Sequence, residues 1–329
     1  MKPPKVSVLI PVYNGETYLA ECLQSILNQD FQDMEILIAD NCSTDRTVDI
    51  IKLFAQCDNR IRWWTNSSNL GCYGNSNACL QQAKGQFIKF VYADDLLISR
   101  QALKKMVEVF EAHPNVALVA SATQMTDGQS KFTSIWNPQG ISGLTNGRKV
   151  IFTCLEKKAK SNNEIGCPSA TMFRRQYATR GFDLRFSYMG DTEMWFHLLE
   201  QGDFYWFSEP LAAFRIHSQQ GSEELRQPDF KNYDCLLLLK TMLEKSWFRK
   251  QAADRLLFSQ IYYKRKIFGN EARPLISEMR SYLPLYRYFF QWVVHKLYRP
   301  LEKLSHYLSP DRLKQKLSLL TRSTKNRHS

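Results

Sequence analysis

The chain has 329 residues, of which 44% are hydrophobic and 13% aromatic, and a formal net charge of +12. This length allows one large α/β domain with an appendage, or two domains, and the composition excludes a disordered protein. The eight cysteines include no Cys-x-x-Cys spacing, which indicates reduced thiols of a cytoplasmic protein rather than a disulfide scaffold or a zinc site. We expect no signal peptide, and the sequence contains no apolar run near the roughly 20 residues that span a bilayer.

Strand and helix patterns alternate along the first 120 residues. Apolar runs predict strands at 6–12, 35–39, 61–65, 86–92 and 116–120, and helical periodicity predicts helices near 19–27, 45–54, 75–83 and 99–111. Strands separated by helices are typical of a parallel sheet with right-handed crossovers.

The second half of the chain is less regular. Residues 127–163 are rich in Gly, Asn, Ser and Lys and are interpreted as a long loop. Strands are predicted at 167–173, 204–207 and 211–216, a helix at 191–201, and a helical, basic and aromatic pattern from 230 onward. We therefore expect a catalytic domain at 1–225 and a helical C-terminal region at 226–329.

Polar residues follow three of the predicted strands. Asp94 and Asp95 end the fourth strand, Asp40 ends the second, and the segment 11–15 turns from the first strand into a helix. The ends of parallel strands share one edge, where open α/β sheets bind ligands. Paired carboxylates at that edge suit a divalent cation that also holds phosphate oxygens. A solvated turn would explain any one of the three groups, but explains all three poorly.

Two nucleotide-binding classes are excluded by motif. No Gly-x-Gly-x-x-Gly follows the first strand, which argues against a dinucleotide dehydrogenase, and no Gly-x-x-x-x-Gly-Lys-Ser/Thr argues against a P-loop phosphotransferase.

An ordered set of short motifs then points to one family. The set comprises VSVLIPVYN at 6–14, ADNCSTD at 39–45, Asn69-Leu70-Gly71 with Asn75 and Asn77, Ala83-Lys84-Gly85, Asp94-Asp95, Gly190-Asp191 and Phe214-Arg215-Ile216-His217. Over about residues 5–220 the chain resembles the family 2 inverting glycosyltransferases, whose fold is GT-A: a Rossmann-like, mostly parallel sheet with flanking helices.

The resemblance implies a role for each matching residue. Asp191 would be the catalytic base, and Asp94, Asp95 and His217 would hold Mn²⁺ or Mg²⁺ with the donor's diphosphate. Asp40 would bond the base of the nucleotide, which is expected to be a uridine diphosphate sugar. The remaining nucleotide-binding residues would be Pro11, Val12, Tyr13, Asn14, Asn69, Gly71 and Asn77, together with Asp94. The acceptor would be a hydroxyl of a glycan or of a lipid-linked glycan.

Three positions depart from the family pattern, and two other functions stay open. Asn41 stands where many relatives have a second acidic partner nearby, Tyr92 stands where the Asp-x-Asp form has its first acid, and Gly190 stands where an acid often precedes the base. A non-catalytic nucleotide-sugar-binding homologue is one alternative. A sugar-phosphate nucleotidyltransferase is the other, although residues 11–15 lack the phosphate loop that it needs. Taken alone, Asp191 would be a helix N-cap and His217 a structural histidine.

The C-terminal segment carries most of the charge. Residues 271–329 contain 12 Lys and Arg against 4 Asp and Glu, with aromatic residues interleaved between 286 and 298. This pattern favours either an anionic membrane surface or a helix packed on the enzyme. No nucleic-acid motif accompanies the charge, so a nucleic acid is not an expected partner. The protein is thus expected in the cytoplasm, with peripheral attachment to the membrane as the first alternative.

Overall fold

The fold is built on one β-sheet that contains both parallel and antiparallel strands. The computed structural model describes residues 2–138, 141–156, 164–218, 220–221 and 228–251. Within these residues ten strands join one sheet, with the order β3-β2-β1-β4-β9-β6-β10-β5, while β7 pairs with β6 and β8 with β10. The chain divides into two compact units, Met1–Leu238 and Leu239–Ser329, and the sheet belongs to the first.

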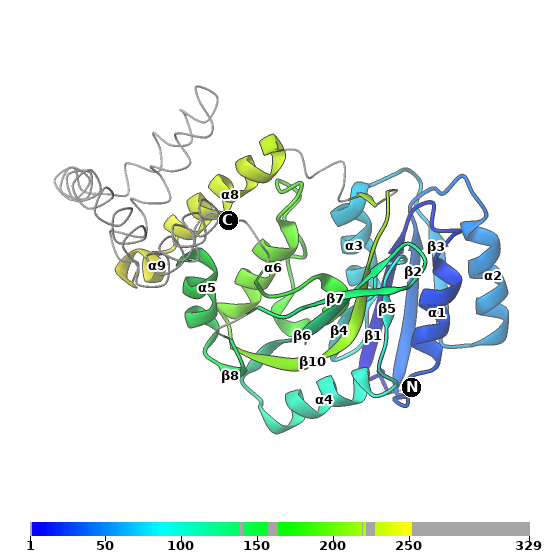
Figure 1. Cartoon of the computed structure of the whole chain (residues 1–329), viewed down its shortest axis with the longest axis horizontal. Coiled ribbons are helices and arrows are strands. Elements are labelled where there is room, and N and C mark those ends of the chain that lie inside the picture. Colours follow the sequence, from blue (N-terminus) through cyan, green and yellow to red (C-terminus); the bar gives the residue numbers. More distant parts are fainter. Residues whose placement is uncertain (1, 139–140, 157–163, 219, 222–227, 252–329) are drawn as a thin grey trace, which may run out of the picture. The chain divides into compact units, whose positions relative to one another are not determined.

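The N-terminal half of the sheet is parallel. β1 (Val6–Val12) pairs with β2 (Met34–Asp40) and β4 (Phe87–Phe90), and β2 pairs with β3 (Ile61–Thr65). Figure 1 shows α3 (Gly71–Gln82) on one side of these strands, and α1 (Leu19–Leu27) and α2 (Thr47–Cys57) on the other. Because helices cover both faces, β1 and β2 are apolar almost throughout, which is why their sequences predict them well.

The other half of the sheet mixes both directions. The long strands β6 (Val116–Asp127) and β10 (Asp203–Ile216) are parallel, whereas β9 (Thr171–Arg174) runs antiparallel between β4 and β6. The short β5 (Leu96–Leu97) pairs antiparallel with β10. The sheet is therefore mostly parallel, as expected, but not wholly so.

The described chain contains further helices and turns. They are α4 (Ala102–Ala112), α5 (Gly147–Glu156), α6 (Gly190–Leu199), α8 (Pro228–Leu243), α9 (Ser246–Gln251), and the single 3-10 turns at Pro168–Ala170 (η1) and Arg175–Tyr177 (η2).

Two predictions about the second half were wrong. The segment 127–163 contains β7 (Phe132–Trp136), β8 (Gly143–Thr145) and α5, not a continuous loop. β7 is exposed at four of its five positions, so it lacks the alternation that marks a half-buried strand. The two strands predicted at 204–207 and 211–216 are one strand, β10, whose register against β6 shifts around Pro210.

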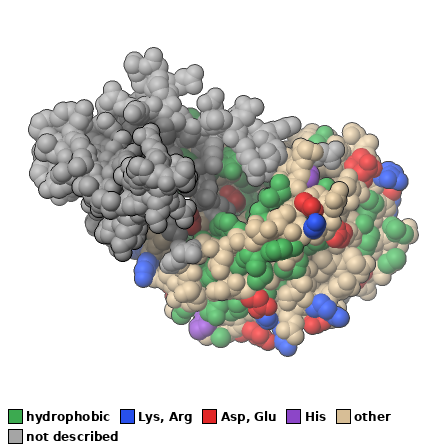
Figure 2. Space-filling model, in the orientation of Figure 1, with side chains coloured by type: hydrophobic (Ala, Val, Ile, Leu, Met, Phe, Trp, Pro, Cys, Tyr) green, Lys and Arg blue, Asp and Glu red, His purple; other side chains and the backbone are tan. Residues whose placement is uncertain are grey.

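The surface of the described part is mixed in character. β7 exposes Phe132 and Ile135, and Figure 2 shows hydrophobic side chains on this face interrupted by acidic and basic ones. In the described ranges no helix combines the length and apolar character needed to cross a membrane.

Candidate active site

A cavity of about 920 Å³ lies at the carboxyl ends of β1 and β4 and reaches the start of α6. The structure brings nine of the predicted site residues to its wall: Pro11, Val12, Tyr13, Asn14, Asn69, Gly71, Asp94, Asp191 and His217. Asp40, Asn77 and Asp95 are not among the residues that line it.

The turn that follows β1 is shaped by its own polar groups. Asn14 has a φ of 49°, a left-handed conformation that asparagine tolerates better than most residues. Its amide N–H donates to Ser43 Oγ at 2.8 Å, and its side-chain oxygen accepts the N–H of Thr44 at 2.8 Å. The turns after β1 and β2 are thus locked together, which fixes one wall of the cavity.

Four asparagines form a second support beneath the cavity. Asn41 donates to Asn69 Oδ1 at 2.8 Å and accepts from Asn66 Nδ2 at 3.1 Å, and Asn66 donates to Asn75 Oδ1 at 2.8 Å. Asn75 in turn donates to the backbone of β2 at Ala39 O, 2.9 Å away. This chain of amides fixes the segment 69–71, where Gly71 has a φ of 71°.

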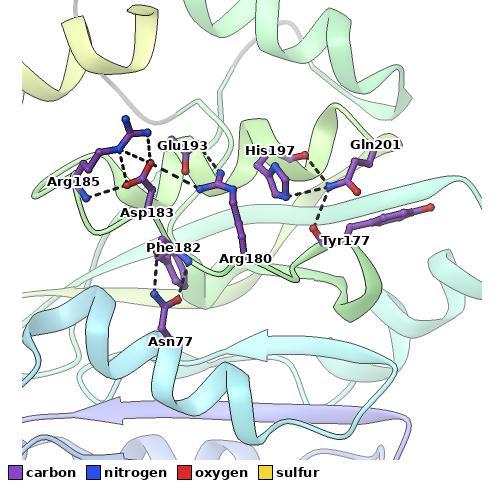
Figure 3. A network of polar contacts seen from close by, with 9 residues as sticks. All are labelled: Asn77, Tyr177, Arg180, Phe182, Asp183, Arg185, Glu193, His197 and Gln201. Carbon is purple, nitrogen blue, oxygen red and sulfur yellow. Dashed lines mark hydrogen bonds and ion pairs between the residues drawn. The ribbon is translucent and has the colours of Figure 1, made fainter. Parts of the chain in front are cut away.

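Two residues expected to bind the nucleotide have other contacts. Asp40 is fully buried, and its carboxylate accepts the N–H of Ser43 at 3.2 Å. Asn77 faces away from the cavity: its side chain donates to Phe182 O at 2.9 Å and accepts Phe182 N–H at 2.7 Å (Figure 3). The contacts of Asn77 tie α3 to the segment before α6, which is a structural role.

Asp94 and His217 meet at one end of the cavity. The side-chain atoms Asp94 Oδ2 and His217 Nε2 are 3.2 Å apart. Asp94 comes from the loop after β4 and His217 from the residue after β10, so the sheet topology joins two groups that are 123 positions apart in the sequence. A side-chain exposure of 30% leaves the Asp94 carboxylate open to the cavity.

Asp95 and Arg215 lie behind this pair. Asp95 is 1% exposed and accepts the N–H of Arg215 at 3.2 Å. Burial, followed by the charge of Asp94, raises the pKa of the Asp95 carboxyl well above its ordinary value. The Arg215 guanidinium donates to Asp94 O at 2.9 Å and to Glu21 at 2.7 Å, and stacks 4.4 Å over the ring of Tyr18. These contacts hold the loop that carries Asp94.

Asp191 lies in the first turn of α6, on the cavity wall. Its Oδ1 accepts the N–H of Thr192 at 2.6 Å. Figure 3 shows how the helix is tied to the preceding segment: Arg180 donates to Glu193 at 2.6 Å. Since Glu193 is 4% exposed, this ion pair fixes the first turns of α6.

The charges on the cavity wall are unusual for a site that binds phosphate. The described residues that line it include the carboxylates Asp94 and Asp191 and the imidazole of His217, but no Lys or Arg. Groups of three or more His, Cys, Asp or Glu able to hold a metal ion are absent from the described ranges. The described part of the wall therefore offers a phosphate group no cationic side chain other than a protonated imidazole.

The comparisons with known proteins agree with this geometry. The model of glycosyl transferase family 2 matches residues 7–182, more than half of the chain. The chain belongs to this family. The resemblance found in the motifs is thereby confirmed.

Similar family 2 proteins come from several bacteria. The GalNAc(5)-diNAcBac-PP-undecaprenol beta-1,3-glucosyltransferase of Campylobacter jejuni is 26% identical over 319 residues, which cover 96% of this chain and 97% of that protein. The putative teichuronic acid biosynthesis glycosyltransferase TuaG of Bacillus subtilis is 26% identical over 214 residues, covering 65% and 79% of the two chains.

A solved structure shares the fold. The crystal structure of S. aureus TarS 1-349 in complex with UDP-GlcNAc superimposes with a TM-score of 0.57 at 17% identity and covers 86% of this chain and 89% of that one. Together with the sheet order, this likeness identifies the fold as GT-A.

Several wall residues could not be found from the sequence. Tyr73, Trp136, Tyr188 and Met189 line the cavity, but an isolated aromatic residue or methionine in a sequence is interpreted as part of the hydrophobic core. The Tyr92 hydroxyl, in place of the first acid of the Asp-x-Asp form, lies 3.5 Å from Ser76 Oγ. The cavity wall there is phenolic instead of anionic.

Proposed function

We propose that this family 2 enzyme is an inverting, metal-dependent glycosyltransferase that moves a sugar from a nucleoside diphosphate, expected to be UDP, to an acceptor hydroxyl. The observation that carries the proposal is the layout of one cavity, with Asp94 and His217 at one end, Asp191 on its wall, and no Lys or Arg on the described wall.

The residues fit a divalent cation. Ligand atoms at right angles on one ion, each about 2.1 Å from it, lie about 3 Å apart, and Asp94 Oδ2 and His217 Nε2 are 3.2 Å apart. The Asp94 carboxylate suits Mn²⁺ or Mg²⁺, His217 would add one nitrogen ligand, and phosphate and water would supply the other ligands. When bound, the ion would offset the negative charge that gathers on the diphosphate leaving group.

Asp191 would act on the acceptor. Its carboxylate takes the proton of the acceptor hydroxyl while the oxygen bonds to the anomeric carbon. At the same time the bond from that carbon to the diphosphate oxygen breaks, and its electron pair leaves with the diphosphate. A single displacement of this kind inverts the anomeric centre, and the base contributes about 10²–10⁴-fold to the rate.

The relatives guide the choice of substrates. The Campylobacter protein is named for an undecaprenol-linked glycan, and the TarS structure holds UDP-GlcNAc. We therefore propose a UDP-sugar donor and a lipid-linked or free glycan acceptor of the cell envelope, and a location on the cytoplasmic side of the membrane. The expectation that no nucleic acid binds stays a prediction.

The test is a pair of matched variants. Asp191→Asn keeps the shape of the side chain and removes its basicity, so transfer should fall about 10²–10⁴-fold while UDP binding with Mn²⁺ stays near wild type. Asp49→Asn, which changes an exposed carboxylate in the first turn of α2, is the control and should transfer normally. Release of UDP from a panel of UDP-sugars, with and without glycan acceptors, is the measurement. Normal transfer by Asp191→Asn would exclude Asp191 as the base.

A further inference from the structure

The loop that leads into α6 is held by a carboxylate from another helix. Asp234 of α8 accepts three consecutive backbone N–H groups on one oxygen, Oδ2: those of Ser187 at 2.9 Å, Tyr188 at 2.6 Å and Met189 at 2.8 Å. Gly190 and Asp191 come next in the chain. The contact therefore lies immediately before the proposed base.

The carboxylate of Asp234 is buried, unlike most aspartate side chains. The residue is 1% exposed, and burial raises the pKa of its carboxyl while the three N–H groups act to lower it. A buried carboxylate is tolerated only when hydrogen bonds replace its hydration. The three N–H groups of residues 187–189 supply these hydrogen bonds. The carboxylate therefore stabilises the loop, and the loop stabilises the buried carboxylate.

Tyr73 also forms hydrogen bonds with the backbone of this loop. The hydroxyl of Tyr73, on α3, donates to Tyr188 O at 3.2 Å and accepts the N–H of Gly190 at 3.0 Å. A Cβ at position 190 would lie 2.5 Å from the Tyr73 ring. The absence of a side chain at Gly190 thus allows Tyr73 to approach, which explains why this position lacks the acid often found in the family.

We infer that Asp234 is a positioning residue for Asp191, acting through the backbone of residues 187–189. This inference rests on the proposed role of Asp191 as the base. All four N–H groups of residues 187–190 are fixed by Asp234 and Tyr73, so the loop enters α6 in one conformation. Asp234 does not line the cavity, so its effect on transfer reaches the acceptor only through the loop. Tyr73 does line it, so its variants would mix two effects.

The experiment uses the full chain with two readouts. Hydrogen exchange of the 187–189 amides, followed by mass spectrometry without ligand, reports the contact itself. In Asp234→Ala these amides should exchange at least about tenfold faster, since hydrogen bonds to a charged acceptor are lost. In Asp234→Asn, which keeps an oxygen acceptor without the charge, the increase should be smaller. The amides of α4 should exchange as in wild type, which reports an intact fold.

The second readout is the kinetics of transfer with the substrates found for the wild-type enzyme. A displaced base costs up to about 10²-fold, so kcat should fall about 10- to 100-fold in Asp234→Ala and less in Asp234→Asn. The KM for the donor and the binding of UDP with Mn²⁺ should stay unchanged. Tyr233→Phe changes the exposed neighbour on α8 and is the matched control, expected to match wild type in both readouts.

The two readouts test the positioning role of Asp234 separately from the role of Asp191 as the base. Unchanged exchange at 187–189, or faster exchange with wild-type kcat, overturns the positioning role of Asp234. A rise in donor KM with unchanged kcat also overturns it, because a positioning residue for the base should act on the chemical step. If Asp191→Asn transfers normally, the base assignment itself fails, whatever Asp234 shows. If Asp191 is required and Asp234→Ala transfers normally, only the present inference fails.

Discussion

Asp94 and His217 are the two side chains on which the proposed metal site rests. Their facing atoms are 3.2 Å apart, and neither would be recognised as a ligand on its own. Tyr92 removes one acid that the family often uses, so the described residues offer fewer anionic ligands than the Asp-x-Asp form. The proposed ion would be held by Asp94 and His217, with Asp95 supporting the loop from behind.

This arrangement predicts a strict metal requirement. Excess chelator should abolish transfer, and added Mn²⁺ or Mg²⁺ should restore it. Asp94→Ala should lower transfer by at least about 10²-fold, the scale of losing one preorganised charge contact, and His217→Ala should raise the Mn²⁺ concentration needed for half-maximal activity. The measurement is UDP release against metal concentration, with Asp49→Asn as the control. Full activity in excess chelator would contradict the metal proposal.

At the scale of elements, a buried lysine joins β4 to the segment before β9. Lys89 is fully buried, and its Nζ donates to Ser169 O at 2.5 Å and Thr171 O at 3.1 Å. Ser169 Oγ in turn accepts the N–H of Tyr92 at 3.0 Å. Burial lowers the pKa of Lys89 to about 7, although the charges of Cys167 and Asp95 act to raise it. Lys89 therefore links β4, the strand that precedes Asp94 and Asp95, to the neighbouring backbone.

The lowered pKa predicts how stability depends on pH. Between pH 7 and the ordinary pKa of lysine the unfolded chain binds more protons than the folded one, so the free energy of unfolding contributed by Lys89 rises with pH. The slope approaches about 1.4 kcal/mol per pH unit for one proton. Urea unfolding of wild type and Lys89→Met between pH 7 and 8.5 should show this extra slope in wild type alone.

The control for this prediction is Lys84→Met, which removes an exposed lysine and should keep the wild-type slope. The lost contacts to Ser169 and Thr171 lower the stability of Lys89→Met by an amount that does not vary with pH, so only the difference in slope counts. Parallel profiles for wild type and Lys89→Met would contradict a lowered pKa for Lys89.

The elements also show where sequence reasoning succeeds. β1 to β4 were predicted within two residues of their bounds, because strands buried on both faces carry continuous apolar runs. The helix predicted at 75–83 begins earlier, at Gly71. β7 and β8 were missed because short, exposed strands carry no such signal. The strand predicted at 167–173 is shorter: Pro168–Ala170 form the 3-10 turn η1, and β9 spans Thr171–Arg174. The direction of β9 was not predicted, since strand direction depends on topology and not on local pattern.

Some residues of the candidate site could be predicted from the sequence, and others could be found only in the structure. The motifs led to Asp94, Asp191 and His217 because each follows a recognisable strand or begins a helix. Asp40 and Asn77 matched the motifs as well, but the structure gives their side chains partners away from the cavity. Asp234 and Tyr73 carry no motif: they meet the loop from 45 to 117 positions away in the sequence, and only the fold makes that contact visible.

At the scale of the whole molecule, charge is distributed unevenly. Residues 271–329 hold 12 Lys and Arg against 4 Asp and Glu, so this segment contributes +8 of the net +12. The segment lies outside the residues that the structure describes, so its membrane role stays a prediction from sequence. A lipid-linked acceptor would give such attachment a purpose, because it would bring the cavity to the surface where the acceptor is held.

The prediction is reversible binding to anionic membranes. Each basic residue near an anionic leaflet contributes about 1 kcal/mol, so replacing Arg287, Lys296 and Arg299 with Gln should weaken binding by about 3 kcal/mol, roughly 10²-fold. Flotation of the full chain with phosphatidylserine-containing liposomes measures this effect. Binding should also weaken as salt rises, because the attraction is screened within a Debye length of about 8–10 Å.

A matched control separates a local site from net charge. Replacing the exposed lysines Lys52, Lys84 and Lys104 with Gln lowers the net charge by the same amount at positions in the catalytic unit. If membrane binding depends on residues 271–329, the control variant should float with the liposomes as wild type does. The variant with Arg287, Lys296 and Arg299 replaced should remain unbound in the bottom fraction. Equal loss in both variants would indicate that net charge alone drives binding. No flotation of wild type at low salt would exclude the membrane role and favour a tail that packs on the enzyme, because burial against protein leaves its aromatic residues unavailable to lipid.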